Sequence, residues 1–268
     1  MTSSTPTAVG LYSIGIRGVD PEALLALAVE HEVPFLHLRG GPRGFDLARR
    51  DTATLDRWAR CSKVSVPITV VTAEIDLIDF ARPGTPTYWR ASAELNRLGH
   101  AASVLRAHAV RLLARHHLDQ RQWADLAVPD LAARHGLTTL IELHEPAWFT
   151  DHSVDALVTH LERAPWLALL MDTAQVQQAW RRSEDPDNLA AQVSVLAPRT
   201  RVIHISDGDD HVPGAGYEIV AETFGHLEND SPVEIAFEWT GADRSPQVCL
   251  DRYRRAVAWW HSRSEANL

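Results

Sequence analysis

Short apolar stretches alternate along this chain with longer amphipathic segments. The apolar stretches are rich in β-branched residues and have the length of strands, whereas the segments between them repeat their apolar positions at helical spacing. Strand candidates lie at residues 9–16, 34–38, 66–71, 108–113, 139–144, 167–172, 201–206 and 232–238. Helix candidates lie at residues 21–30, 54–60, 88–106, 119–135, 153–163, 187–196, 216–227 and 246–261.

This alternation predicts an α/β fold with a parallel sheet. Strands that are apolar on both faces and joined by crossover helices are typical of parallel sheets, and eight such units favour closure into a (β/α)8 TIM barrel. An open, doubly wound sheet is the alternative. No linker or low-complexity segment divides the sequence, so we expect a single TIM-barrel domain over residues 1–268 in which residues 1–7 and 262–268 form flexible tails.

Composition and charge argue against several classes of function. The formal net charge of −9 disfavours binding to nucleic acid or to an anionic membrane through a basic surface. No uninterrupted apolar stretch approaches the roughly 18 residues that a membrane helix needs. The two cysteines, Cys61 and Cys249, lack metal-ligand spacing, and the start of the chain does not resemble a signal peptide. We therefore expect a reduced, cytoplasmic protein that acts on a small-molecule substrate, with a homo-oligomer left open.

A carboxylate or an imidazole lies late in each of the last four strand candidates. These residues are Glu142, Asp172, His204 and Glu238, which follow one another at intervals of 30, 32 and 34 residues, or one strand-helix unit each. Because the active site of a TIM barrel forms at the C-terminal ends of the strands, we expect the four side chains to converge there. Three carboxylates beside an imidazole are unstable there without a cation, and together they offer a site for a divalent metal. The alternative is a set of unrelated strand-end residues paired with arginines.

The sequence around these residues resembles the xylose-isomerase-like TIM barrel superfamily. Glu142-Leu-His144 is similar to the superfamily's Glu-Asn-His, and His204-Ile-Ser-Asp207 is similar to its His-x-(Lys or Ser)-Asp. Met171-Asp-Thr173 and the loop Pro213-Gly-Ala-Gly216 match further motifs. The superfamily contains sugar and sugar phosphate isomerases and epimerases, inosose and dehydroshikimate dehydratases, and apurinic endonucleases.

The resemblance implies a metal-dependent proton transfer. It implies that Glu142, Asp172, His204 and Glu238 bind one divalent ion (manganese, magnesium, cobalt or zinc), and that Glu142 and Glu238 are also the catalytic pair. A carboxylate on each face of a substrate enediolate is suited to removing and returning a proton next to a carbonyl. We therefore predict an isomerase or epimerase of a sugar-like, polyhydroxylated substrate. A dehydratase with the same first step is the alternative, and a phosphodiesterase or a binding protein without catalysis agrees less well with the charge and the complete ligand set.

Four further residues are predicted to contact the substrate. His144 lies two residues beyond Glu142 and therefore on the same face of its strand. Arg39 follows the second strand, where a guanidinium can bind a carboxylate or phosphate through paired hydrogen bonds. The resemblance adds Asp207 as a third predicted contact. It also adds Gln175, which lies at a position where many members of the superfamily have histidine, so we expect a substrate that differs from theirs.

Structural interpretations of some of these residues stay open. His144 is also compatible with a structural histidine, and Arg39 and Arg43 with a solvated surface turn. Arg111 lies within the fourth strand, where we expect it to pair with a carboxylate inside the barrel, with Glu234 as the candidate partner.

Overall fold

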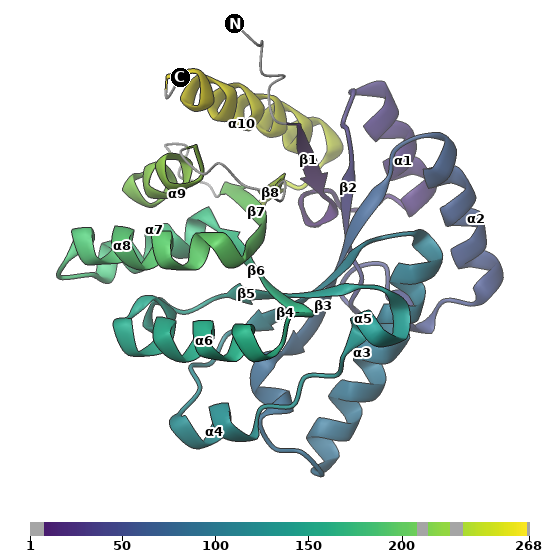
Figure 1. The fold of residues 1–268 in the computed structure, drawn as a ribbon. Coiled ribbons are helices and arrows are strands. Elements are labelled where there is room, and N and C mark those ends of the chain that lie inside the picture. The colour runs from purple at the N-terminus through teal and green to yellow at the C-terminus, as the bar shows by residue number, and fades with distance from the viewer. Residues whose placement is uncertain (1–7, 208–213, 226–232, 267–268) are drawn as a thin grey trace, which may run out of the picture.

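Eight parallel strands form a closed barrel at the centre of the protein (Figure 1). The computed structural model describes residues 8–207, 214–225 and 233–266. The strands are β1 (Val9–Tyr12), β2 (Leu36–Arg39), β3 (Ile68–Asp76), β4 (Ala109–Ala114), β5 (Thr138–Leu143), β6 (Leu167–Asp172), β7 (Thr200–Asp207) and β8 (Glu234–Trp239). Each strand pairs with the next one along the chain, and β8 closes the ring by pairing with β1, for example through Ile235 and Val9. The predicted TIM barrel is therefore confirmed.

The helices surround the barrel, as Figure 1 shows. They are α1 (Pro21–Glu30), α2 (Thr52–Val64), α3 (Pro86–Leu105), α4 (Gln120–Asp125), α5 (Leu131–His135), α6 (Asp151–Arg163), α7 (Thr173–Arg182), α8 (Pro186–Leu196), α9 (Ala215–Gly225) and α10 (Pro246–Ala266). Local sequence sets several of their starts. In α1, for example, Asp20 accepts a hydrogen bond from the backbone N–H of Ala23 at 2.8 Å, and Pro21 occupies the first helical position, where no N–H is needed.

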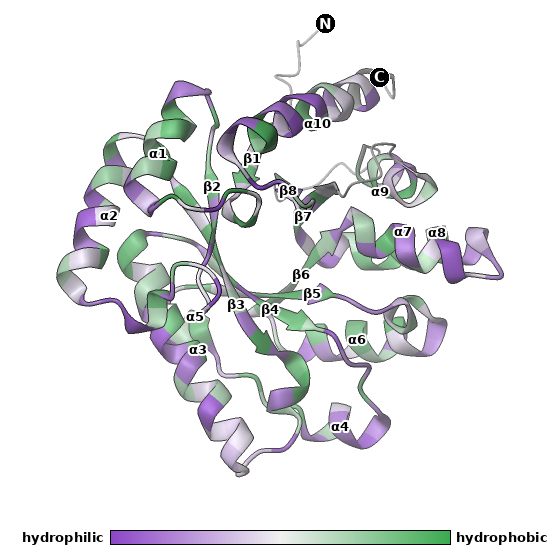
Figure 2. Ribbon diagram, turned by 180° about the vertical axis from the view of Figure 1, so that it is seen from behind, coloured by the Kyte–Doolittle hydropathy of each residue, from purple (hydrophilic) through white to green (hydrophobic). Residues whose placement is uncertain are grey.

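The hydrophobic core has two parts. A small cluster fills the inside of the barrel and consists of Val70, Ala109, Leu140, Ala168, Leu170 and Val202. A much larger cluster lies between the strands and the surrounding helices. In Figure 2 the helices alternate between hydrophobic and hydrophilic segments along their length, as amphipathic helices packed on a sheet do. The barrel is thus a packed scaffold, and chemistry is confined to its polar strand ends and loops.

The main differences from the sequence-based expectation concern residues 119–135, helix α7 and the end of helix α10. Residues 119–135 form two short helices, α4 and α5, because Pro129 disfavours helical backbone at Val128. Helix α7 was not expected, and it begins directly after β6 because Asp172 accepts hydrogen bonds from the first backbone N–H groups of the helix. Helix α10 continues to Ala266, beyond the expected end at residue 261. Residues 1–7, predicted as a flexible tail, lie outside the described residues, and so do residues 267–268.

None of the helices in the described part of the chain is long and apolar enough to span a membrane.

Candidate metal centre

The four residues predicted from the sequence form one buried cluster. Glu142 extends from β5, Asp172 from β6, His204 from β7 and Glu238 from β8, and one ligand atom of each lies within 4.8 Å of the others. None of the four is more than 8% exposed. Parallel neighbouring strands bring the side chains together because each residue lies near the carboxyl end of its strand. This cluster is called the metal cluster below.

Arg111 is the nearest counter-charge inside the barrel. Its Nε lies 2.7 Å from Oε2 of Glu142, and its other nitrogens donate to the carbonyl of Ala73 at 3.0 Å and to the hydroxyl of Tyr12 at 3.1 Å. The expected pairing of Arg111 with Glu234 is wrong, because Glu234 begins β8 at the opposite end of the barrel and bonds to His37 there. Three carboxylates and one guanidinium leave the metal cluster with a formal charge of −2. A divalent cation neutralises that charge.

The carboxyl groups of the metal cluster differ in proton affinity. Burial, together with the neighbouring carboxylates, raises the pKa of Asp172 to about 7. The pKa of Glu238 also rises to about 7, from burial and from the charge of Glu142. Burial alone would raise the pKa of Glu142 as well, but the charges of Arg111 and His144 lower it to about 2. Without a cation, the cluster therefore retains protons near neutral pH, as a site built for a cation is expected to do.

A chain of hydrogen bonds through the barrel interior orients His204. Glu234 is bonded to Nε2 of His37 at 2.8 Å, and Nδ1 of His37 lies 2.9 Å from Nε2 of His204. Burial lowers the pKa of both imidazoles to about 4, so each is neutral and carries one N–H. Since a carboxylate only accepts, His37 must donate to Glu234 through Nε2, and its Nδ1 must accept the Nε2–H of His204.

This assignment leaves Nδ1 of His204 without a proton, and its lone pair faces the metal cluster. That atom lies 2.9 Å from Oε2 of Glu238, which is also an acceptor. Two acceptors at hydrogen-bond distance need a proton or a cation between them. The donor set of three carboxylates and an imidazole, its charge and this pair of facing acceptors all fit a divalent metal. Sequence reasoning missed His37, although a histidine in the apolar stretch Leu36-His-Leu38 carried the same signal as His204.

Asp172 is held by several hydrogen bonds. Its Oδ1 accepts the backbone N–H groups of Ala174 at 2.8 Å and Gln175 at 3.1 Å, and its Oδ2 accepts the hydroxyl of Ser206. The same carboxylate therefore ends β6, begins α7 and belongs to the metal cluster. These bonds fix the position of its oxygens before any ligand arrives.

The structure places the other predicted residues at the carboxyl end of the barrel. His144 bonds to Glu142, with its Nε2 2.6 Å from Oε1, and is partly exposed. Gln175 lies half-buried in the first turn of α7. Arg39 ends β2 and forms an ion pair with Glu74 at 2.8 Å. Asp207 ends β7, but its side chain lies outside the described part of the structure.

The start of α9, at the end of the predicted glycine motif, packs against a glutamine that sequence reasoning did not single out. Gln177 of α7 is buried, and its Oε1 accepts the backbone N–H of Gly216 at 2.7 Å. A Cβ atom at Gly216 would lie 2.3 Å from the backbone of Gln177, so only glycine allows this close approach. Pro213 of the predicted motif lies outside the described residues.

Solved structures share this architecture across nearly the whole chain. D-Psicose 3-epimerase from Clostridium cellulolyticum H10 has a TM-score of 0.68 at 13% identity, with 96% of this chain and 98% of the epimerase covered. IolI, solved with a bound zinc atom, has a TM-score of 0.73 at 10% identity and coverage of 96% and 98%. The probable 3-DHS dehydratase AsbF from Bacillus anthracis has a TM-score of 0.66 at 14% identity and coverage of 93% and 98%. At such low identities the likeness shows a common fold.

The comparison of sequences is more specific. No curated protein matches the chain at a significant level. The sequence model of the xylose isomerase-like TIM barrel family, however, matches residues 25–259, and the chain therefore belongs to that family.

Proposed function

We propose that this protein is a divalent-metal-dependent isomerase or epimerase that transfers a proton next to the carbonyl of a sugar-like, polyhydroxylated compound. The observation that carries the proposal is the pair of glutamates in one buried cluster. Glu142 comes from β5 and Glu238 from β8, with β6 and β7 between them. Two carboxylates that approach from separate strands can serve the two faces of one bound substrate.

The proposed metal ligands are Glu142, Asp172, His204 and Glu238. A bound divalent cation supplies a Lewis acid that stabilises negative charge on the substrate oxygens when the neighbouring proton leaves. IolI, a barrel of the same fold, was solved with a bound zinc atom, which supports a divalent metal here.

The two glutamates are expected to play different parts. Among the described residues, no arginine lies at ion-pair distance from the Glu238 carboxylate, whose neighbour there is the neutral imidazole of His204, so this carboxylate can accept a proton from the substrate and return it. Glu142 is held ionised by Arg111 at 2.7 Å and is bonded to His144 at 2.6 Å. We therefore propose that Glu238 removes the proton and that the pair of Glu142 and His144 serves the opposite face.

The remaining contacts bind the substrate. His144 and Gln175 lie at the carboxyl end of the barrel with partly exposed side chains, where an imidazole and an amide can hydrogen-bond to substrate hydroxyls. Asp207 at the end of β7 is proposed as a third such contact, from its position in the motif.

Hydrogen exchange tests the proposal at its first chemical step. The metal-loaded protein is incubated in heavy water with a panel of ketoses, keto-cyclitols and keto-acids, and deuterium in the recovered substrate is measured by mass spectrometry. We expect Glu238→Gln to slow exchange by about 10²–10⁴, the usual contribution of general acid-base catalysis. Glu94→Gln, which alters a carboxylate in a separate surface pocket, is the matched control. Unchanged exchange in Glu238→Gln would remove this residue from the proposed mechanism.

The products of the same incubations separate two outcomes of one mechanism. An isomerase or epimerase returns a compound of unchanged mass apart from deuterium, whereas a dehydratase expels a hydroxyl and the product loses one water. The fold of the probable dehydratase AsbF makes this second outcome a real alternative. Both depend on the same metal cluster and the same proton abstraction.

A further inference from the structure

Four arginines line a cavity at the carboxyl end of the barrel. The cavity has a volume of about 620 Å³, and its arginines are Arg17, Arg39, Arg43 and Arg244. Arg39 ends β2, and the other three lie in the segments that follow β1, β2 and β8, which are neighbouring strands in the barrel. No acidic residue is among the described residues that line it. We call this space the arginine cavity.

The arginine cavity lies beside the metal cluster. Glu238 belongs to the metal cluster, and the loop that follows its strand carries Arg244, whose charge acts on the Glu238 carboxyl. Tyr12 stacks on His204 with ring centroids 5.0 Å apart, and the next residue, Ser13, lines the cavity. One substrate molecule can therefore reach both places from the same mouth of the barrel.

Within the described residues, the positive charge of the arginine cavity is balanced only in part. Arg39 and Arg43 share one carboxylate, that of Glu74, at 2.8 Å each. Within the described residues, neither Arg17 nor Arg244 has a carboxylate at ion-pair distance. Counted over the part of the chain that the structure describes, four guanidiniums and one shared carboxylate leave the cavity with a formal charge of +3, in a protein whose net charge is −9.

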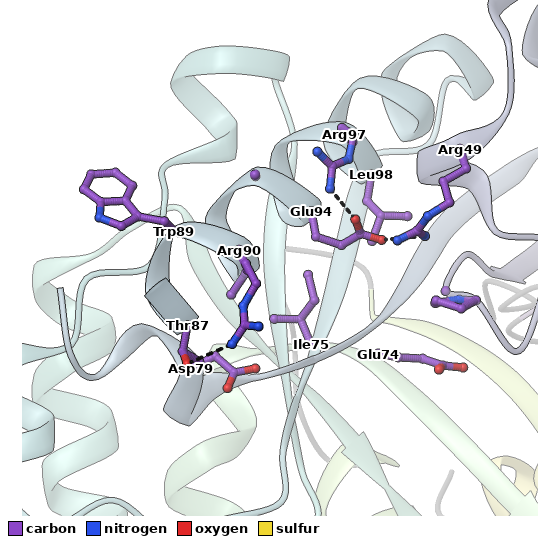
Figure 3. A pocket seen from close by; sticks show the side chains of 14 residues that line it. Arg49, Glu74, Ile75, Asp79, Thr87, Trp89, Arg90, Glu94, Arg97 and Leu98 are labelled. Atoms are coloured by element: carbon purple, nitrogen blue, oxygen red, sulfur yellow. Dashed lines mark hydrogen bonds and ion pairs between the residues drawn. The ribbon is translucent and has the colours of Figure 1, made fainter. Parts of the chain in front are cut away.

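A neighbouring pocket shows the contrasting, balanced arrangement (Figure 3). Its arginines, Arg49, Arg90 and Arg97, lie among the carboxylates Asp79 and Glu94, and Glu74 also lines it but pairs with the arginines of the cavity. Glu94 pairs with Arg97 at 2.7 Å and with Arg49 at 3.2 Å, as the dashed lines in Figure 3 mark. In this pocket, Glu94 thus pairs with two of the three arginines, whereas in the arginine cavity neither Arg17 nor Arg244 has such a partner among the described residues.

The arginine cavity is also held in shape. The guanidinium of Arg244 donates to the backbone carbonyls of Gly241, Ile14 and Thr240 at 3.2, 3.2 and 3.0 Å, which orients it but adds no negative charge. Arg39 is only 16% exposed, and its backbone N–H donates to the hydroxyl of Ser13 at 2.8 Å. Arginines oriented in advance can bind an anion with little loss of side-chain entropy.

We propose that the arginine cavity binds an anionic group of the substrate, a carboxylate or a phosphate, while the metal cluster holds its carbonyl end. The substrate is then an acidic, polyhydroxylated carbonyl compound instead of a neutral ketose. Guanidiniums bind either anion through paired, charge-assisted hydrogen bonds, so the chemistry is shared and the experiment separates the two. That the bound anion is part of the substrate rests on the proposed function.

Anion binding to the metal-free protein tests the cavity independently of catalysis. Inorganic phosphate and succinate are titrated separately by calorimetry into the wild type and into Arg17→Gln, which changes an exposed side chain and is expected to fold normally. We expect at least one anion to bind the wild type, and its Kd to rise about tenfold or more in the variant, as expected for one lost charged hydrogen bond. Arg90→Gln, from the balanced pocket, should leave the Kd unchanged.

Exchange kinetics then test the link to substrate. For a ketose bearing the anion that binds, Arg17→Gln should raise KM about tenfold with little change in kcat, whereas exchange into a neutral ketose should not respond. If neither anion binds, or if Arg17→Gln and Arg90→Gln weaken binding equally, the arginine cavity is not an anion site. If an anion binds as described but no ketose or keto-acid exchanges deuterium, the cavity stands and the proposed function fails.

Discussion

Removing the metal should make the stability of this protein depend strongly on pH. In the metal-free protein, burial and neighbouring carboxylates raise the pKa of Asp172 and of Glu238 to about 7. In the unfolded chain both groups titrate near their ordinary values of about 4. As pH rises from about 4 to about 7, the unfolded state therefore releases these protons first, and the folded state loses stability relative to it.

The magnitude follows from the size of the shifts. Each shift is roughly three pKa units, and one unit corresponds to about 1.4 kcal/mol, so each group should cost the metal-free protein about 4 kcal/mol above pH 7, and the pair about 8 kcal/mol. For a chain of this length, a loss of about 8 kcal/mol lowers Tm by roughly 16–32 °C. Glu142 acts in the opposite sense, but its pKa of about 2 places its effect at pH values below about 4.

Thermal unfolding followed by circular dichroism measures the effect. After chelation and dialysis, the Tm should fall between about pH 5 and pH 8, and added manganese should restore it far more at pH 8, where no proton competes for the carboxylates. In Asp172→Asn, which removes one of the two acids, the fall should be about half as large. In Glu94→Gln, which changes an acid outside the metal cluster, the fall in Tm should be as large as in the wild type. A metal-free Tm that stays constant over this range, or a manganese effect of equal size at both pH values, would refute the reasoning.

Three further predictions concern single side chains. His37→Leu should weaken manganese binding by about 10–100-fold, because His204 loses the partner that fixes its tautomer. His37→Asn, whose Oδ1 can still accept from His204, should recover part of the lost affinity. Manganese affinities equal to that of the wild type in a calorimetric titration of both variants would exclude this positioning role. Gln175→His should raise exchange into ordinary ketohexoses and lower activity on the native substrate, whereas no change in either means that this side chain does not face the substrate. Tyr253→Phe should cost about 1 kcal/mol in urea unfolding, because its hydroxyl donates to the buried carbonyl of Val9 at 2.7 Å; a midpoint equal to that of the wild type would contradict this.

The sequence alone was sufficient to predict the barrel and the four residues that form the metal cluster. Strand length, apolar patterning and helix caps are local properties, so the order of strands and helices could be inferred from neighbouring residues alone. Parallel strands in a closed barrel all end on the same side, which is why one polar residue per strand, as in Glu142, Asp172, His204 and Glu238, was enough to predict that they converge. Helix α7 was not predicted because its start depends on Asp172, which also ends the preceding strand.

Only the tertiary structure decided which side chains meet inside the barrel. In the register of β4 and β5, Leu113 pairs with Glu142, and Arg111 lies two residues before Leu113 on the same face, so its long side chain reaches Glu142 diagonally. Glu234 lies at the other end of the barrel and bonds to His37 instead. Register is a relation between strands, and no pattern within one strand encodes it.

The arginine cavity could be recognised only in the tertiary structure, for a related reason. Arg39 was predicted from the sequence as a substrate contact, but nothing in the sequence connects it with Arg17, Arg43 and Arg244, which lie in loops after three different strands. Their partners could not be inferred, because loops lack the periodicity that ties a strand or helix residue to one face. The closure of β8 on β1 brings these loops together and concentrates positive charge beside the carboxylates of the metal cluster. Long-range closure of the chain, and not local preference, therefore created the site for which we predict an anionic ligand.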